Sequence, residues 1–389
     1  MGAGSRALAP SPGAAAREAG PGRVADRVAD PRAPVSVLHV LDHVRNVGNG
    51  IVNVAVDLAC AQALAGDRVA VASAGGDYEP LLAERGVHHH RLVREDTLRG
   101  RARLVARLHG ILRVVRPEVV NAHRPYAVAA SRLLRPLHGF TLVATDHNEF
   151  DAKGRVVALA DVVVAVSEGA AASLVAGGVD RRKIRVVQNG PLFGARESVL
   201  DATGEVELER PAVVSVAGLV KRKGVHVLLD AFELVSEGGY ELNLYFVGEG
   251  PERARLEERA SRSRFASRVH FEGFQSDPRR YLRAADAFVL ASHRDPFPLA
   301  ALEARASGCA VIVSGLDGLP EAVDGGNAGI IVPAGDAPAL ADAMISLLRS
   351  PDELARWQAR AGRELERFSA SRMAHATDVV YREALRARR

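Results

Sequence analysis

The chain has 389 residues, more than the about 250–300 at which a single hydrophobic core stops growing, so two domains are predicted. Hydrophobic residues make up 48% and charged residues 25%, as in ordinary soluble globular proteins. The formal net charge is +4, from 51 basic and 47 acidic residues that are interspersed along the chain. Because no Lys/Arg stripe carries interleaved aromatic residues, the sequence argues against a nucleic-acid partner.

The cysteines, the apolar runs and the N-terminal composition bear on where the protein is located in the cell. The two cysteines, Cys60 and Cys309, fall in predicted apolar elements and are expected to be reduced and buried, which favours a cytoplasmic location. No uncharged apolar run reaches the about 18 residues of a membrane span. Residues 1–33 are rich in Ala, Gly, Pro and Arg without an aromatic residue, and we predict a disordered tail there. Because this tail carries arginines, a weak peripheral contact with the cytoplasmic face of the membrane is an open alternative.

From residue 34 onward, short apolar runs alternate with amphipathic segments. Strands are expected at 35–41, 69–72, 87–92, 119–122, 142–145, 162–166, 184–187, 213–217, 242–247, 269–271, 287–291 and 310–313. Helices are expected at 51–64, 98–115, 127–134, from 168, at 225–236, from 298, at 339–348 and through 352–388. This alternation predicts doubly wound parallel sheets, whose ligands lie beyond the carboxyl ends of the strands.

The loop after the first strand holds Gly48, Asn49 and Gly50. A dinucleotide-binding fingerprint would need a third glycine where Asn53 stands, so a two-domain dehydrogenase is disfavoured. The loop is either a ligand-facing turn or a flexible strand-to-helix connection.

Histidines follow two of the predicted strands. His123 and His147 each come directly after a buried run, where a ligand site is expected, and His147 is the better candidate. The three histidines at 88–90 lie within a strand, where alternate side chains face opposite ways, so they cannot form one metal face.

A basic loop at 218–224 opens the second half of the chain, after an aperiodic linker at 191–210. It holds Arg222 and Lys223 between glycines and precedes a helix, a pattern that suits phosphate binding. The alternative is a solvated basic turn. In either case the loop is expected to be exposed, and mutating it is expected to affect the fold little.

The stretch 287–314 is predicted as strand, loop, helix and strand. Pro298 stands where a helix would begin, and its missing N–H suits the first helical position. Asp295 lies eight residues before Glu303, which falls in the second turn. The free N–H groups of such a helix start attract anions. The alternative is a salt-bridged helix start at the surface.

Several motifs resemble retaining GT-B glycosyltransferases of family 4, of the group 1 type. D-P-F-P-L-x-x-L-E at 295–303 is similar to the family's E-x-F-G-x-x-x-x-E, with Asp and Pro replacing Glu and Gly. The loop ending at Lys223 is similar to G-R-L-x-x-x-K-G, but Gly218 occupies the arginine position. V-G-x-G-P at 247–251, T-x-H at 145–147, A-D-x-V-x-A-V-S-E at 160–168 and N-G at 189–190 follow the family in order and spacing.

The resemblance implies a role for each matched residue. Lys223, Arg222, His147 and Asp295 would act on the diphosphate and the sugar. Glu303 would hold the ribose. The other implied donor-binding residues are Gly48, Asn49, Gly50, Gly248, Gly273, Phe274, Phe297, Pro298 and Leu299.

The resemblance also implies an architecture and a reaction. Its fold is α/β of the GT-B type, with two Rossmann-like domains facing across a cleft. The expected boundaries are a tail at 1–33, an acceptor domain at 34–190, a linker at 191–210, a donor domain at 211–365, and a helix at 366–389 that crosses back to the first domain. The expected activity is transfer of a sugar from a nucleotide-diphosphate donor to a hydroxyl of a glycan, lipid-linked sugar or small molecule, without metal or other cofactor. The alternative is a nucleotide-binding homologue without transferase activity.

Overall fold

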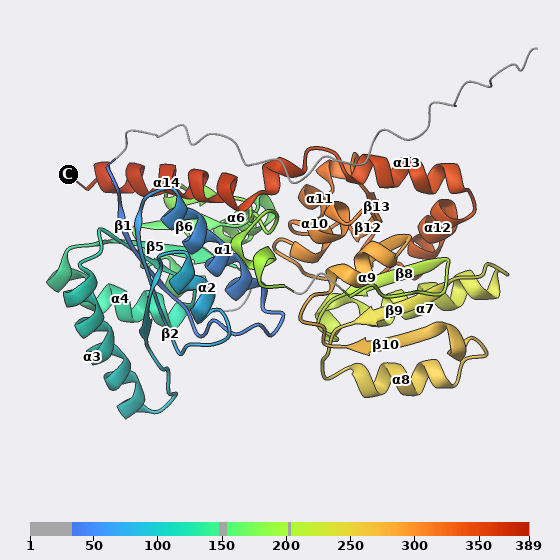
Figure 1. Cartoon of the computed structure of the whole chain (residues 1–389), viewed down its shortest axis with the longest axis horizontal. Coiled ribbons are helices and arrows are strands. Elements are labelled where there is room, and N and C mark those ends of the chain that lie inside the picture. The colour runs from blue at the N-terminus through green and yellow to red at the C-terminus, as the bar shows by residue number, and fades with distance from the viewer. Residues whose placement is uncertain (1–32, 148–153, 201–203, 389) are drawn as a thin grey trace, which may run out of the picture. The chain divides into compact units, whose positions relative to one another are not determined.

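The computed structural model describes residues 33–147, 154–200 and 204–388, so the predicted tail lies outside it apart from residue 33. From Val35 onward the chain forms one compact unit with two parallel sheets (Figure 1). In the described residues the first sheet has the strand order β3-β2-β1-β4-β5-β6-β7 and the second β10-β9-β8-β11-β12-β13. We call the part carrying the first sheet the N lobe and the part carrying the second the C lobe.

The N lobe alternates strands and helices as the sequence predicts. Its strands are β1 (Ser36–Val40), β2 (Arg68–Ser73), β3 (His88–Arg91), β4 (Val119–Ala122), β5 (Thr141–Asp146), β6 (Val162–Ala165) and β7 (Ile184–Val186). Its helices are α1 (Gly50–Leu64), α2 (Glu79–Glu84), α3 (Leu98–Val115), α4 (Pro125–His138), α5 (Gly154–Val157) and α6 (Glu168–Ala176), with short 3-10 turns η1 (Arg181–Lys183) and η2 (Ala195–Ser198) around β7.

The C lobe repeats the pattern. Its strands are β8 (Ala212–Val216), β9 (Asn243–Val247), β10 (Val269–Gly273), β11 (Ala287–Leu290), β12 (Ala310–Ser314) and β13 (Ile330–Val332). Its helices are α7 (Val225–Glu237), α8 (Arg253–Ser261), α9 (Arg279–Ala284), α10 (Leu299–Ala306), α11 (Leu319–Ala322), α12 (Ala337–Leu348) and α13 (Pro351–Ala361). The 3-10 turns are η3 (Lys221–Lys223), η4 (Ala266–Arg268), η5 (Asp324–Gly326) and η6 (Leu365–Phe368).

The strands are apolar on both faces because helices cover both. On β1, Leu38 packs in a core with Leu108 of α3, whereas the adjacent Val37 packs with Val54 of α1 and with Tyr381. In each sheet the strand order reverses once, between β1 and β4 and between β8 and β11. Such reversal points open a crevice at the carboxyl ends of the strands, which is where ligands bind in open α/β sheets.

The helical region at 352–388 is interrupted, contrary to the prediction of continuous helix. Gly362 follows the end of α13, and Glu364 adopts a left-handed backbone with φ 52°. Helix α14 (Ala370–Arg386) then begins after Ser369, whose hydroxyl accepts a hydrogen bond from the Arg372 N–H. Periodicity alone cannot reveal such a break, because both helices are amphipathic.

Helix α14 belongs to the N lobe by its contacts, as the resemblance implies. It packs along α1, and Tyr381 is completely buried with Val37 and Val54. The Tyr381 hydroxyl accepts a hydrogen bond of 2.7 Å from Asn121 Nδ2 of β4. The chain therefore returns to the first sheet after completing the second.

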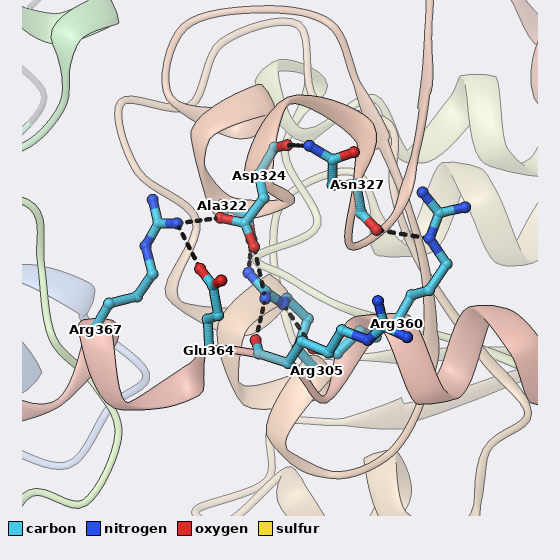
Figure 2. A network of polar contacts seen from close by, with 9 residues as sticks. Arg305, Ala322, Asp324, Asn327, Arg360, Glu364 and Arg367 are labelled. Atoms are coloured by element: carbon cyan, nitrogen blue, oxygen red, sulfur yellow. Dashed lines mark hydrogen bonds and ion pairs between the residues drawn. The ribbon is translucent and has the colours of Figure 1, made fainter.

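A buried arginine anchors α10 to the segments that follow it in the C lobe (Figure 2). Arg305 is 1% exposed and donates to the carbonyls of Ala361, Ala322 and Arg363 and to Asp324, at 2.5–3.0 Å. Burial lowers the pKa of Arg305, while Asp324 raises it. We call Arg305 and these partners the arginine hub, which joins α10 to the ends of α11 and α13.

Candidate active site

One pocket of about 690 Å³ lies between the carboxyl ends of the two sheets. Its walls come from the β1–α1 loop and His147 in the N lobe, and from the β8–α7 and β11–α10 loops in the C lobe. Three hydrogen bonds between described residues join the lobes nearby: Ser167 Oγ donates to the Pro296 carbonyl at 2.6 Å, and both Gln188 and the Gly169 N–H donate to Glu321, at 2.9 and 3.1 Å.

The structure brings the predicted site residues together. Those that line the pocket are Gly48, Asn49, Gly50, His147, Arg222, Lys223, Gly248, Phe274, Asp295, Phe297, Pro298, Leu299 and Glu303. Gly273 does not line it, and instead its carbonyl accepts a hydrogen bond from the Gly248 N–H at 2.8 Å. That hydrogen bond ties the turn after β9 to the end of β10.

The basic loop is built into the lobe and is not a free turn, which corrects the expectation of an exposed loop. Residues 221–223 form the 3-10 turn η3, and Gly224 follows with φ 64°. A Cβ on Gly224 would lie 1.8 Å from the Ala291 carbonyl oxygen, so only glycine allows this close approach to the end of β11. The His293 N–H also donates to the Arg222 carbonyl at 2.8 Å.

Two of the three basic side chains of this loop have partners within the protein. Lys223 Nζ lies 2.5 Å from Asp295 Oδ2, and Asp295 is only 4% exposed. Arg222, which is half-buried and lines the pocket, donates to the Arg294 carbonyl at 2.8 Å. Gly218, at the position where the family has arginine, has room for a side chain, since a Cβ there would meet only the Glu249 carbonyl oxygen at 3.7 Å.

Helix α10 points its first turn into the pocket. Pro298 is its N-cap with ψ 99°, and the helix begins at Leu299, so the prediction of Pro298 as the first helical residue was one position early. The N-cap needs no N–H of its own for the helix, which is why proline fits there too. The Ala301 N–H donates to the Pro298 carbonyl at 3.2 Å, whereas the N–H groups of Leu299 and Ala300 have no intrahelical acceptor and are available to an anion.

Glu303 of α10 stands beside two arginines that the sequence interpretation missed. Arg196 of η2 is 5% exposed, and its Nε donates to Asp57 at 2.7 Å. Arg279 pairs with Asp277 at 2.8 Å, and both arginines line the pocket. Burial raises the pKa of Glu303, and the charges of Arg196 and Arg279 oppose that rise. Burial works against the charged form of Arg196, but Asp57 and Glu303 outweigh it and raise its pKa.

These arginines were missed for a physical reason. Arg196 lies in the aperiodic linker, and its partner Asp57 is 139 residues away on α1. The only signal in the sequence is an Arg and a Glu in a segment without hydrophobic periodicity, which is typical of any surface loop. The pairing depends on how the linker packs against α1.

The glycine loop of the N lobe lies against the C lobe. Gly48 has φ 67°, and a Cβ there would lie 3.2 Å from the Phe274 ring. A Cβ on Gly50 would contact Leu299 at 3.4 Å. Asn49 caps α1, because its Oδ1 accepts a hydrogen bond from the Ile51 N–H at 3.0 Å. The loop therefore closes the pocket, and the Asn49 side chain is occupied by the helix.

The histidines at the strand ends differ in position. His147 lines the pocket and also a smaller cavity of about 90 Å³ behind it, whereas His123 lines only the smaller cavity. Burial lowers the pKa of His147 to about 3, with Arg124 adding to the effect. His147 is therefore neutral at neutral pH.

Other predicted features are placed as follows. Cys60 and Cys309 are buried free thiols, as expected. No set of three or more His, Cys, Asp and Glu residues in the described part of the chain is arranged to bind a metal ion. Within the same residues, no helix is long and apolar enough to cross a membrane.

Comparison with protein families gives two adjacent matches. Residues 48–190 match the family model described as Glycosyltransferase Family 4, and residues 201–364 match that described as Glycosyl transferases group 1. Together the two models follow the two lobes of the structure.

Curated relatives agree with these matches. Alpha-maltose-1-phosphate synthase of Mycolicibacterium smegmatis is 30% identical over 337 residues, 74% of this chain and 86% of the relative. The lipopolysaccharide core biosynthesis glycosyltransferase LpsE of Rhizobium meliloti is 34% identical over 164 residues, 42% of this chain and 47% of LpsE. The match spans about half the length of LpsE and of the Mycobacterium tuberculosis glycogen synthases.

Solved structures share the fold. HepE of Anabaena in complex with UDP-glucose superposes with a TM-score of 0.74 at 19% identity, covering 89% of this chain and 99% of HepE. Sucrose-phosphate synthase of Thermosynechococcus elongatus gives a TM-score of 0.74 at 22% identity, covering 92% and 100%. Two doubly wound lobes with a shared pocket, both family models and a relative matched over most of its length lead to one conclusion: the chain belongs to the group 1 glycosyltransferases and has the GT-B fold.

Proposed function

We propose that this chain transfers a sugar from a nucleotide-diphosphate donor to a hydroxyl acceptor, with retention of the anomeric configuration and without a metal ion. The observation that carries the proposal is a single pocket that holds Lys223, the first turn of α10 and Glu303. A cation and free N–H groups suit a diphosphate, and a carboxylate suits the two hydroxyls of a ribose. The acceptor class, a glycan, a lipid-linked sugar or a small-molecule hydroxyl, and the cytoplasmic location remain proposals.

The chemistry follows from where charge develops. The bond from the sugar's anomeric carbon to the diphosphate breaks, while a bond from the acceptor oxygen forms on the same face. The acceptor's proton passes to the departing phosphate oxygen. Negative charge grows on the diphosphate, so a fixed cation and the helix N-terminus stabilise the transition state more than the ground state.

Lys223 must change partner for this step. Its ammonium is held by Asp295, so a bound diphosphate competes with that contact. Asp295 in turn accepts hydrogen bonds that position a ligand hydroxyl once the ammonium turns to the phosphate. The donor class is supported by the HepE structures, which hold UDP, UDP with glucose, and UDP-glucose.

The test begins with binding. UDP or GDP at 100 times its dissociation constant should stabilise the fold by about 2.7 kcal/mol, seen as a raised melting temperature. Slow hydrolysis of nucleotide sugars then identifies the donor, and NMR of the product shows whether the anomeric configuration is retained. No thermal shift with any nucleoside diphosphate would refute the proposal.

The metal-free part of the proposal has its own test. No D-x-D sequence follows a strand in either half of the chain. Activity is therefore expected to survive EDTA. Loss of turnover on chelation with recovery on adding manganese would contradict it.

A second candidate is a nucleotide-binding homologue that transfers nothing. It is favoured by Gly218 at the arginine position and by the engagement of Lys223 with Asp295. Binding of nucleotide sugar without turnover toward a broad acceptor set would support this candidate over the first.

A further inference from the structure

Three histidines from three neighbouring strands form a diagonal line across the first sheet. His39 lies on β1, His123 follows β4 and His147 follows β5, and these strands are adjacent. His39 is paired with Asn121, two residues before His123, and side chains two apart share a face of a strand. His147, after β5, is offset from His123, after β4, in the same way. From His39 to His123 to His147, each histidine therefore lies at the next strand of the sheet and closer to the pocket.

The rings are in direct hydrogen-bond contact. His39 Nδ1 is 3.0 Å from His123 Nε2, and His123 Nδ1 is 2.9 Å from His147 Nε2. Neighbouring ring centroids are 5.2 Å apart and the planes differ by 24° and 26°. At the far end, His39 Nε2 is 2.7 Å from Gln62 Oε1 of α1. We call His39, His123 and His147 the histidine file.

The file ends in the pocket. His147 Nδ1 has no hydrogen-bond partner within the described part of the chain, and His147 lines the pocket. His39, His123 and His147 are 0%, 3% and 9% exposed, so water does not reach the inner contacts.

Burial also determines the protonation state of the three histidines. It lowers the pKa of His39 to about 4 and that of His147 to about 3, and it lowers the pKa of His123 well below the usual value. Each neutral ring has one N–H and one lone pair. Because each contact needs one of each, all N–H groups in the file must point the same way.

The side-chain amide of Gln62 is oriented with its oxygen toward His39, and this orientation sets that direction. The reverse orientation would place the Nδ1–H form on His147, which is the outcome that the tautomer measurement below would detect. An oxygen can only accept, so His39 Nε2 carries the hydrogen and His39 Nδ1 accepts from His123 Nε2–H. His123 Nδ1 then accepts from His147 Nε2–H. His147 is left with a lone pair on Nδ1 at the pocket. An amide oxygen takes no proton at neutral pH, so the file orients a tautomer and does not conduct protons.

We propose, resting on the proposed function, that His39 and His123 are positioning residues which hold His147 as a neutral hydrogen-bond acceptor for a hydroxyl of the bound sugar. A phosphate oxygen would face the Nδ1 lone pair and be repelled. The diphosphate is thereby directed to Lys223 and α10, and the sugar hydroxyl to His147.

The first test is the tautomer of His147 by long-range 15N–1H NMR of the full chain labelled at histidine. At pH 7 the wild type should show only the Nε2–H form. In His39→Phe the ring shape stays but the acceptor for His123 is lost, so the Nδ1–H form of His147 should appear. An Nδ1–H form in the wild type, or an unchanged tautomer in His39→Phe, would overturn the proposal. The wild-type spectrum decides the first point even if the variant does not fold.

The second test is ligand binding by calorimetry, with UDP and UDP-glucose or GDP and GDP-mannose as probes. His39→Phe and His147→Ala should reduce the affinity gained from the sugar by about three- to tenfold, the worth of one neutral hydrogen bond. Their affinity for the diphosphate alone should not change. Equal weakening of both ligands would refute the proposal.

A matched control uses the other hydrogen-bonded histidine pair, in which His138 Nε2 is 2.9 Å from His109 Nδ1 between α4 and α3. His138→Phe should alter neither the His147 tautomer nor sugar binding. If no diphosphate binds the wild type, the proposed function fails, while the NMR result still decides the tautomer.

Discussion

At the scale of single residues, Lys223 is both a candidate catalytic group and a structural one. Its side chain is 19% exposed, and that of its partner Asp295 is 6% exposed. A nearly buried carboxylate that loses its cation is costly, because neither water nor another charge replaces it. The two functions of this pair can be separated by mutation.

Lys223→Ala should slow transfer by about one to two orders of magnitude, since a charge-assisted hydrogen bond is worth about 1.5–3 kcal/mol. It should also lower the free energy of unfolding by about 1–3 kcal/mol. In Lys223→Ala with Asp295→Ala, stability measured by urea denaturation should partly recover while turnover stays low. Full turnover in the single variant would show that this lysine does not act on the donor phosphates.

Gly218 offers a test in the opposite direction. Its backbone and surroundings admit a side chain. An arginine there would add a second cation near the diphosphate, so Gly218→Arg should raise donor turnover by up to about tenfold. Gly218→Gln, which adds bulk without charge, is the control. An unchanged rate in Gly218→Arg would mean that Arg222 or another cation already fills this role.

The buried histidines predict sensitivity to acid. Their pKa values are lowered in the folded state, so the unfolded chain takes up protons first as pH falls below about 6.5. Their contribution to stability is complete above about pH 6.5 and declines as pH falls toward about 4. For each of these histidines, the free energy of unfolding should fall by about 2 kcal/mol between pH 7 and pH 5. Urea unfolding at the two pH values checks this, and the loss should be smaller in His39→Phe.

At the scale of elements, helix α10 has two faces with separate tasks. Glu303 lines the pocket, and Arg305 enters the arginine hub two residues later. The guanidinium also lies 5.3 Å from the centroid of Phe368 in η6, and Phe368 lies near the pocket residue Phe297. The donor helix is thus tied to the segment that leads into α14.

Arg305→Met should destabilise the fold by about 3–5 kcal/mol, because it leaves three carbonyls and Asp324 Oδ2 without their donor, although Arg367 still pairs with Asp324 Oδ1 at 2.8 Å. Arg360→Met is the matched control: Arg360 donates to the Asn327 carbonyl at the exposed side of the same region (Figure 2). Its loss should cost less than about 1 kcal/mol. Similar unfolding energies for the two variants, measured in urea, would contradict the role of the hub.

Regular elements were predictable because their signals are local. The bounds of α3 and β4 match the sequence prediction, and the other predicted strands differ by a residue or two, since apolar runs and caps lie within each segment. The short helices α2, α8 and α9 were missed because polar residues dominate or the run is brief. In the pocket, motif residues were found by resemblance. Arg196 and the histidine file depend on pairings between distant segments, which no local pattern encodes. Arg279 pairs locally with Asp277, but its place beside Glu303 depends on how α9 packs against α10.

At the scale of the whole molecule, function depends on contacts that join the lobes. The pocket takes walls from both, and Gly48 and Gly50 of one lobe lie against Phe274 and Leu299 of the other. Closing these loops around a ligand would exclude water from the donor and limit its hydrolysis.

The return of α14 to the N lobe has a consequence for synthesis. A ribosome releases the strands of the first sheet early, yet the surface formed by Val37, Val54 and Asn121 stays uncovered until Tyr381 has been made. The lobe translated first is therefore completed last, after the entire C lobe has emerged. Until then its apolar face is a natural binding surface for chaperones, and a ribosome that stalls shortly before α14 would leave a nascent chain whose second lobe can fold while its first is unfinished.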